Sequence, residues 1–339
     1  MTFAEPLCCI DMGTTNCRVF FVDGNRIRTR VEGEFGVRDV ARGQSPEDLR
    51  AKLEALILEA AQRIQSSGLV ALPRYALGAG MLTSAQGLME IPHVPAPATG
   101  LELARHMVRF APGLARSMEL FLVPGVRTGP VSADPETALR SDVMRGEEVL
   151  VLGLLAIGRM RPNTALLNLG SHWKWIWTDS SGSIAGSRSA LTGELIHVTQ
   201  SVTLLSSGLP RTKLETLHEK WLELGTREAR RSGLTRSLFC VRLLEQAGQG
   251  TPEERLSFLY GAFLETEFAA LVRDESFLGL RSVCITGPPP LAEAWKQKLS
   301  QMHCEVGVVQ EEEREHAYVE GLRHTFLLAR QHGCLSAQT

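Results

Sequence analysis

Short apolar runs that alternate with glycine-containing turns dominate the first forty residues. Residues 9–23 hold two such runs, rich in β-branched and aromatic side chains, on either side of a turn of small residues. This pattern is typical of a β-hairpin, and strand-like segments continue over residues 26–40. Apolar residues with helical spacing follow over 46–64, introduced by a Ser-Pro pair and acidic residues. With a strand over 75–79, the order strand–strand–helix–strand predicts an α/β domain.

The rest of the chain continues to mix helical and strand-like patterns without a long linker. A basic segment at residues 227–236 has the composition of an exposed loop. The other predicted elements are helices over residues 101–110, 149–157, 252–271, 291–299 and 319–330, and strands over residues 119–123 and 282–287.

The turn between the first two predicted strands has the composition of an anion-binding turn. Backbone N–H groups at Gly13 and Thr14 are open to a ligand, because no large side chain blocks the approach. Thr15 and Asn16 add hydroxyl and amide donors. Asp11, at the end of the first strand, is placed to hold the water shell of a Mg²⁺ ion bound to polyphosphate. An ordinary hairpin is the alternative that this turn alone leaves open.

The same strand–turn–strand pattern occurs a second time, at residues 167–177. Asn168 falls where Asp11 falls in the first copy, an offset of 157 residues (168 − 11). An internal repeat of this kind indicates two related domains. His172 and Lys174 share the strand face opposite three core-forming tryptophans, so we expect them to face a ligand. The turn of this second copy consists of Gly170, Ser171 and His172.

Bulk composition narrows the class of protein. The chain has 339 residues, 44% hydrophobic and 22% charged, which is ordinary for one large or two medium globular domains. A net charge of −2 argues against nucleic acid or an anionic membrane as the main partner. The seven cysteines are scattered and odd in number, so reduced core thiols and a cytoplasmic location are expected.

Two phosphate-binding hairpins, one in each half of the chain, resemble the actin-like superfamily of sugar kinases, heat-shock ATPases and actin. In that superfamily, ATP lies between two related domains and both turns hold its phosphates. The resemblance implies that Asp11, residues 13–16 and residues 170–172 bind the nucleotide. It also implies that the strand end at Gly287 borders the adenine.

Acidic residues crowd the start of the apolar helix predicted over residues 149–157. Acids there suit the helix dipole, which is the structural alternative. The superfamily resemblance implies a second role, because its corresponding helix carries the polar residue that activates the nucleophile. Glu147 and Glu148 are therefore the candidates for the general base, and Asp142 is the next candidate.

A glycine-rich segment follows the strand predicted over residues 75–79. Gly80, Met81 and Ser84 lie at the C-terminal end of that strand, where open α/β sheets bind ligands. A plain turn between strand and helix is the alternative. With Arg145 and Lys174, these residues complete the candidate substrate site.

The chain resembles the 2-dehydro-3-deoxygalactonokinase family of sugar-acid kinases nearly end to end. Its most specific signal is the hexapeptide V-M-R-G-E-E at residues 143–148. The chain departs from the family pattern in a loop where the family has Trp and Tyr, and after Gly287. These departures are Leu88 and His93 in the loop, and Pro288, Pro289 and Pro290 in place of a small polar residue. The other matching motifs lie at residues 11–16, 36–37, 80–92, 124–125, 170–175 and 192–195.

The resemblance implies a fold of two ribonuclease-H-like, actin-like ATPase domains around a central cleft. The N-terminal domain would hold residues 1–160 and the C-terminal domain residues 161–315. The last helix, residues 316–335, would pack back onto the N-terminal domain.

The implied function is ATP-dependent phosphorylation of the 6-hydroxyl of 2-dehydro-3-deoxy-D-galactonate, with ATP and Mg²⁺ as cofactors and Asp11 as the metal-binding residue. Arg145 or Lys174 would meet phosphate or the substrate carboxylate. The alternatives are a kinase for a related 2-keto-3-deoxy sugar acid and a non-catalytic actin-like regulatory protein that binds sugar or nucleotide. The expected partners are a small sugar acid and ATP, without nucleic acid or membrane, and a homodimer is the assembly considered.

Overall fold

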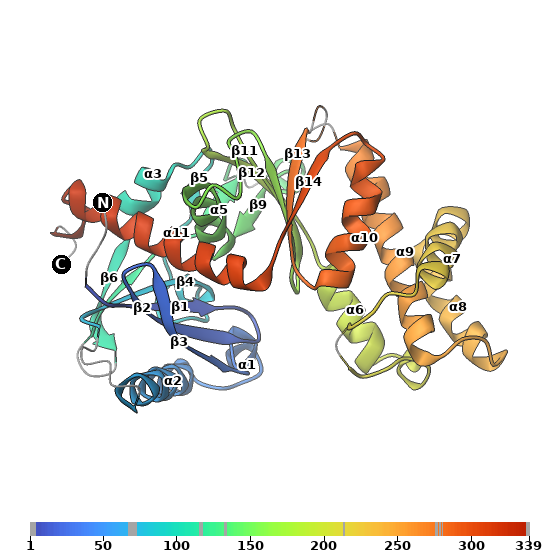
Figure 1. Cartoon of the computed structure of the whole chain (residues 1–339), viewed down its shortest axis with the longest axis horizontal. Coiled ribbons are helices and arrows are strands. Elements are labelled where there is room, and N and C mark those ends of the chain that lie inside the picture. The colour runs from blue at the N-terminus through green and yellow to red at the C-terminus, as the bar shows by residue number, and fades with distance from the viewer. Residues whose placement is uncertain are drawn as a thin grey trace. The chain divides into compact units, whose positions relative to one another are not determined.

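The computed structural model describes residues 5–66, 73–114, 118–131, 134–212, 214–274, 277, 279 and 281–336 (Figure 1). These residues form two compact units. The first contains the described residues up to Asn163, Ile176–Arg188 and those from Glu311 onward. The second contains Thr164–Trp175 and Ser189–Gln310. The domain boundaries expected at residues 160 and 315 stay a prediction.

The main sheet of the first unit has the strand order β3–β2–β1–β4–β7–β6. β1 runs antiparallel to β2 and parallel to β4, and β4 runs parallel to β7. β3 and β6 join the two edges antiparallel to their neighbours. The bounds are β1 Leu7–Met12, β2 Cys17–Asp23, β3 Arg26–Gly33, β4 Tyr75–Gly80, β6 Val108–Leu114 and β7 Met118–Leu122.

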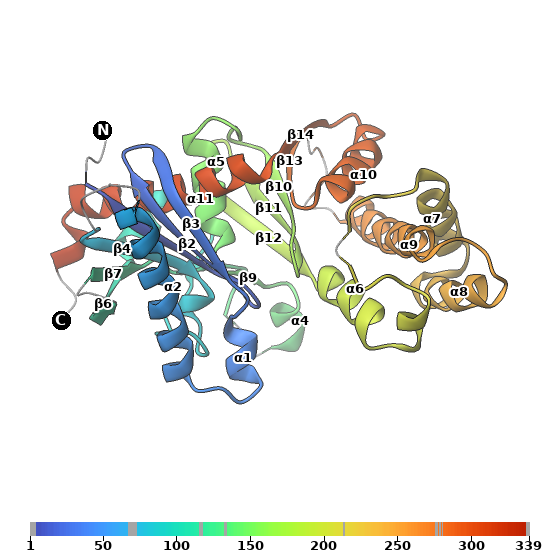
Figure 2. The ribbon, with the colours of Figure 1, turned by 60° about the horizontal axis from the view of Figure 1, so that its bottom comes forward.

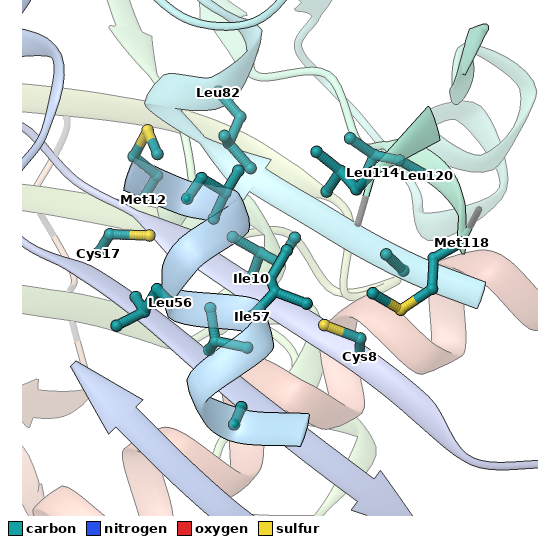
Figure 3. Packing of buried hydrophobic residues seen from close by; sticks show 14 of the residues in the cluster. Cys8, Ile10, Met12, Cys17, Leu56, Ile57, Leu82, Leu114, Met118 and Leu120 are labelled. Carbon is teal, nitrogen blue, oxygen red and sulfur yellow. The ribbon is translucent and has the colours of Figure 1, made fainter. Parts of the chain in front are cut away.

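Helix α2 (Pro46–Ser66) covers one face of this sheet (Figure 2). Ser45 begins the helix as expected, because its hydroxyl accepts a hydrogen bond from the Asp48 N–H at 3.0 Å. The apolar residues that recur at helical spacing are buried against β1 and β2, and Figure 3 shows Ile57 beside Ile10 and Cys8 in this core. Each such side chain contributes about 1.5–3 kcal/mol when fully buried. The helical positions concerned are Leu49, Leu53, Leu56, Ile57, Ala60 and Ile64.

Helix α11 (Glu311–Gln331) packs against α5 (Glu147–Ala156), α3 (Gly100–Arg105) and β4 (Figure 1). The ring of Phe326 lies 5.3 Å from that of Phe121 and 5.4 Å from that of Tyr75, and this aromatic cluster fixes the helix on the sheet. A smaller sheet of order β5–β8–β9 leads into α5. Its strands are β5 Val94–Pro95, β8 Val126–Thr128 and β9 Asp142–Met144, with α4 Pro135–Ala138 before β9.

The second sheet has the order β12–β11–β10–β13–β14, with β13 parallel to both β10 and β14. This order repeats that of β3–β2–β1–β4–β7 in the first sheet. Trp173 and Trp175 pack edge-on against Trp295 of α10 (Pro289–Ser300) at 5.9 and 5.8 Å, so the tryptophan face lies in the core as expected. The bounds are β10 Ala165–Leu169, β11 Trp173–Thr178, β12 Ile184–Ala190, β13 Ser282–Thr286 and β14 Glu305–Val309.

Four helices complete the second unit. They are α6 (Thr192–Ser201), α7 (Glu219–Ser232), α8 (Leu234–Gln246) and α9 (Pro252–Arg273). The loop predicted over residues 227–236 is wrong, because this segment lies in α7 and α8. Arg227 pairs with Glu223 four residues earlier and Arg231 with Glu228 three residues earlier, and these pairs stabilise a charged helix surface.

Two other predicted elements also differ. Residues 37–41 form the short helix α1 (Val37–Ala41) and not a strand, because the Arg38 N–H turns back to donate to the Thr14 carbonyl at 3.0 Å. The helix predicted over residues 101–110 ends at Arg105, and Val108–Leu114 pairs with β7 instead.

No helix in the described part of the chain is both long and apolar enough to cross a membrane.

Candidate active site

The turn between β1 and β2 brings the first set of predicted nucleotide-binding residues together. The Gly13 N–H closes it by donating to the Asn16 carbonyl at 2.9 Å. Residues 13–16 are all partly exposed, so a ligand can reach the turn. Asp11 lies one residue before the end of β1, directly opposite Arg18 of β2.

The carboxylate of Asp11 lies among cations that sequence reasoning missed. Arg18 Nη1 is 3.3 Å from Asp11 Oδ2, and Arg18 Nε is 3.1 Å from Glu32. Burial alone would lower the pKa of Arg314, but its hydrogen bonds and ion pair with Glu311, helped by the charge of Asp11, raise that pKa. The hairpin register was the available signal for Arg18, because a four-residue turn after Met12 sets position 18 opposite position 11.

Asp11 fits a Mg²⁺ site of the kind completed by a nucleotide. The side chain is 18% exposed, and Mg²⁺ usually takes only one or two protein carboxylates beside substrate phosphates and water. No group of three or more His, Cys, Asp or Glu side chains within the described ranges could hold a metal by itself. The donor set therefore suits a metal that arrives with polyphosphate.

The second turn, between β10 and β11, carries the other predicted phosphate-binding residues. Asn168 Oδ1 accepts a hydrogen bond from the Thr286 hydroxyl at 2.9 Å. His172 Nε2 lies 3.4 Å from a carboxylate oxygen of Glu194, and the Glu194 N–H donates to the Ser171 carbonyl at 2.7 Å. The start of α6 is thereby fixed to the turn.

A glycine packs against each turn at the same place in the repeat. A Cβ atom at Gly36 would lie 2.5 Å from the Thr14 carbonyl oxygen, and one at Gly193 would lie 2.2 Å from that of Gly170. Both glycines lie 23 residues after the turn glycine (36 − 13 and 193 − 170). Any side chain would displace the turn, so these contacts set the backbone that faces a ligand.

Each parallel neighbour strand also ends in a glycine of positive φ. Gly80, which is paired with Met12 of β1, has a φ of +81°. Gly287 lies directly after β13 and beside Leu169 of β10, and its φ is +142°. Gly80 was predicted to contact substrate and Gly287 the nucleotide. Pro288 caps α10 directly after Gly287.

The start of α5 distinguishes the two candidate bases by their burial. Glu148 is fully buried, and both its carboxylate oxygens accept the Gly146 N–H, at 2.8 and 2.9 Å. Glu147 is only partly buried, and its Oε2 accepts the Arg145 N–H at 3.2 Å. Asp142 lies further away in sequence, on β9 opposite Thr128. The accessible carboxylate is that of Glu147.

Tyr318 of α11 shows that the first turn and the start of α5 meet in one region of the first unit. Its hydroxyl is buried and donates to the Ile10 carbonyl at 3.5 Å. Burial raises the pKa of Tyr318 well above its usual value, and the negative charges of Asp11 and Glu148 raise it further. A chain separation of 308 residues between Tyr318 and Ile10 kept this residue out of the sequence prediction.

The predicted substrate residues occupy different surroundings. The Ser84 hydroxyl donates to the Met81 carbonyl at 2.8 Å, within the segment after β4. Lys174 is buried on β11, with 5% of its surface exposed. Arg145 is half-buried and hydrogen-bonded to neighbours on both sides of that segment. Their roles toward a substrate remain predictions.

Comparisons with known proteins agree with this arrangement. The 2-keto-3-deoxy-galactonokinase family profile matches residues 11–325. The 2-dehydro-3-deoxygalactonokinase of Escherichia coli (strain K12) is 25% identical over 324 residues, covering 93% of this chain and 96% of its own. A solved Sinorhizobium meliloti protein, provisionally assigned as a 2-dehydro-3-deoxygalactonokinase, has a TM-score of 0.72 at 19% identity, over 94% of this chain and 95% of its own. An activator of 2-hydroxyisocaproyl-CoA dehydratase from Clostridium difficile, solved with bound ADPNP, has a TM-score of 0.52 at 9% identity, over 98% and 99%.

The repeated strand order and the solved relatives confirm the predicted class, an α/β protein built from ribonuclease-H-like units of the actin-like ATPase and sugar-kinase fold. Within that class, the chain belongs to the 2-keto-3-deoxy-galactonokinase family. It is an ATP-dependent sugar-acid kinase, as the sequence predicted.

Proposed function

We propose that the protein transfers the γ-phosphoryl group of ATP to the 6-hydroxyl of 2-dehydro-3-deoxy-D-galactonate, which gives the 6-phosphate and ADP. The observation that carries this proposal is the family match over residues 11–325, which includes both turns and Glu147. The name of the Escherichia coli relative, 2-dehydro-3-deoxygalactonokinase, supports the same acceptor.

The two turns would hold the ATP phosphates. The Gly13 N–H, which the sequence predicted to be open to a ligand, instead closes its turn by donating to the Asn16 carbonyl. The proposed donors are the other backbone N–H groups of residues 14–16 and 170–172, and phosphoryl transfer depends mainly on such positioning and charge stabilisation. Asp11 would hold Mg²⁺, which when bound neutralises charge on the phosphates. Arg18 adds a fixed positive charge 3.3 Å from Asp11.

Glu147 would act as the general base. The acceptor O6 forms a bond to the γ-phosphorus, the bond from phosphorus to the ADP oxygen breaks, and the O6 proton passes to the Glu147 carboxylate. Glu148 would keep the start of α5 in place, because both its carboxylate oxygens accept a hydrogen bond from the Gly146 N–H. The residues proposed to lie on the side of the site that binds the sugar acid are Gly80, Met81, Ser84, Arg145 and Lys174.

A kinase for a related 2-keto-3-deoxy sugar acid is the second candidate. Leu88 and His93 support it, because they stand where the family has aromatic residues in the acceptor-side loop. A cytoplasmic location is part of the proposal, on the ground of the odd and scattered set of seven cysteines in the sequence.

A coupled ADP-release assay over a panel of 2-keto-3-deoxy sugar acids of different stereochemistry tests the proposal. We expect the galactonate derivative to give the highest kcat/KM, with the product phosphorylated at position 6 by ³¹P NMR. Asp11→Asn keeps the size of the side chain and should abolish turnover without lowering the thermal midpoint. A preference for another acid favours the second candidate, and no ADP release with any acid refutes both.

A further inference from the structure

The guanidinium group of Arg145 joins the two ends of one surface segment, residues 81–93, which we call the 81–93 loop. Arg145 Nη1 donates to the Thr83 hydroxyl at 2.7 Å, and Nη2 donates to the Ile91 carbonyl at 2.9 Å. Nη2 also lies 3.5 Å from His93 Nδ1. Thr83 is near the start of the loop and Ile91 near its end, so one side chain contacts both ends. The Ile91 N–H also donates to the Thr83 carbonyl at 3.0 Å, and Arg145 ties this joined pair to the start of α5.

The middle of the 81–93 loop faces solvent while its ends are buried. Thr83 and Ile91 are buried, at 0% and 4% exposure, whereas residues 85, 86, 89 and 90 are exposed. Inside the loop, the Leu88 N–H donates to the Leu82 carbonyl at 2.9 Å. The loop therefore has a defined shape with anchored ends. Ser84 lies between them partly exposed, whereas Leu88 packs against the core of the first unit.

Arg145 also contacts the candidate base through its backbone. Its N–H donates to Glu147 Oε2 at 3.2 Å, so the residue that holds the loop also holds the carboxylate. A shared anchor of this kind matters when a substrate must contact the loop and present one hydroxyl to the carboxylate, because misplacement by about 1 Å can cost about a hundredfold in rate.

We propose that Arg145 is a positioning residue for the acceptor, which sets the place of the 81–93 loop relative to Glu147 and thereby the affinity and selectivity for the sugar acid. This inference rests on the proposed function. It differs from direct binding of the substrate carboxylate by Arg145, because it assigns the function of the guanidinium to its hydrogen bonds with Thr83 and Ile91.

The geometry requires arginine at this position. A planar guanidinium can donate in two directions at once, to Thr83 on one side and to Ile91 on the other. A lysine ammonium is a point charge on a flexible chain and cannot hold both ends in one plane. Arg145→Lys therefore keeps the charge and removes the bridge.

Steady-state kinetics of Arg145→Lys test the proposal. We expect the KM for the sugar acid to rise at least about tenfold, while the KM for ATP stays within about twofold. The thermal midpoint of the variant is measured beside that of the wild type, to show that the chain is folded. An unchanged acceptor KM in a folded variant overturns the proposal.

A pair of acceptors separates positioning from carboxylate binding. The sugar acid is compared with its analogue in which a hydroxymethyl group replaces the carboxylate. If Arg145 positions the loop, Arg145→Lys reduces kcat/KM for both acceptors by a similar factor. If Arg145 binds the carboxylate, only the acid is affected, and the proposal is wrong.

Thr83 offers a matched pair of variants for the same contact. Thr83→Val keeps the shape and removes the hydroxyl that accepts from Arg145 and donates to the Gly80 carbonyl at 3.0 Å. We expect it to raise the acceptor KM in the same direction as Arg145→Lys. Thr83→Ser keeps a hydroxyl at this position and should keep most of the affinity for the sugar acid. The double variant Thr83→Val/Arg145→Lys should be little worse than Arg145→Lys alone, and full additivity would contradict a shared anchor.

Hydrogen exchange separates a failure of this inference from a failure of the proposed function. Amides of residues 84–90 should exchange at least about tenfold faster in Arg145→Lys, whether or not any acid is phosphorylated. A wild type without turnover would refute the proposed function, whereas unchanged exchange in the variant would refute the anchoring role itself.

Discussion

Replacing Glu147 and Glu148 singly with glutamine separates catalysis from structure at the start of α5. The two side chains are adjacent, yet Glu148 is fully buried beneath the Gly146 N–H and Glu147 is partly accessible. Glutamine keeps the size and the hydrogen-bonding oxygen of each residue while it removes the charge. Any difference between the variants therefore reports on the carboxylate.

The expected magnitudes follow from these surroundings. A general base contributes about 10²–10⁴-fold in rate, so Glu147→Gln should lower kcat at least about a hundredfold. Its stability should change by no more than about 0.5 kcal/mol, because its carboxylate is accessible to water. Glu148→Gln replaces a charge-assisted hydrogen bond with a neutral one in a buried site, at a cost of about 1–2 kcal/mol in the free energy of unfolding. Its kcat should stay within about tenfold of the wild type.

The assay combines single-turnover ADP release at saturating acceptor with urea unfolding of both variants. Acceptor and ATP binding are measured by calorimetry, to show that a slow variant still binds its substrates. If both variants turn over at nearly the wild-type rate, the base lies elsewhere, and Asp142→Asn becomes the next test. If Glu148→Gln is the slow variant with wild-type stability, the assignment of the two roles is reversed.

Two further predictions concern the second unit. Gly193→Ala should weaken ATP binding at least about tenfold by calorimetry, because its Cβ would lie 2.2 Å from the Gly170 carbonyl oxygen. The control Gly307→Ala, whose Cβ would have no atom within 4 Å, should bind ATP normally. Equal affinities of the two variants would refute the close contact. Burial would raise the pKa of Glu265, but hydrogen bonds from Arg230 and Lys298 outweigh it and lower that pKa. The lowered pKa adds stability above the unfolded value of about 4.3, and this stability is lost as the pH falls through the folded pKa. Urea midpoints should therefore show Glu265→Gln less stable than wild type at pH 7, with the gap closing as the carboxylate of the wild type is protonated in acid. A gap that persists in acid would contradict the ion pair.

The local sequence was enough to predict most of the fold. The repeated strand–turn–strand pattern predicted both hairpins, and apolar spacing from Leu49 to Ile64 predicted α2. Two of the errors arose where distant contacts decided the conformation. Residues 37–41 became helical because Arg38 turns back to Thr14, and residues 108–114 became a strand because β7 offers a partner.

The sequence predicted the motifs of the candidate site, but it did not predict the residues from distant parts of the chain that contact those motifs. The turn at residues 13–16 is continuous in sequence, so its pattern alone indicated an anion-binding turn. The acids at residues 147–148 are also continuous, but only the resemblance to the superfamily made them candidate bases. Tyr318 approaches Ile10 from the far end of the chain, and the contact of Arg145 with Thr83 spans 62 residues. Such contacts leave no local signal, because only the folded sheet brings the partners together.

The repeat also explains why its two copies share a pattern with little identity. In both, the turn is held by a backbone contact with a later glycine, so the requirement falls on shape and on the absence of a side chain. The residue two positions before the turn glycine, Asp11 or Asn168, is under a different requirement, which depends on charge. Asp11 lies 3.3 Å from Arg18, whereas Asn168 accepts a hydrogen bond from the Thr286 hydroxyl. A carboxylate at position 168 would gain only that neutral donor in place of a cation. This difference supports the proposal that the first turn, with Asp11, binds the metal and that the second binds phosphate with neutral donors.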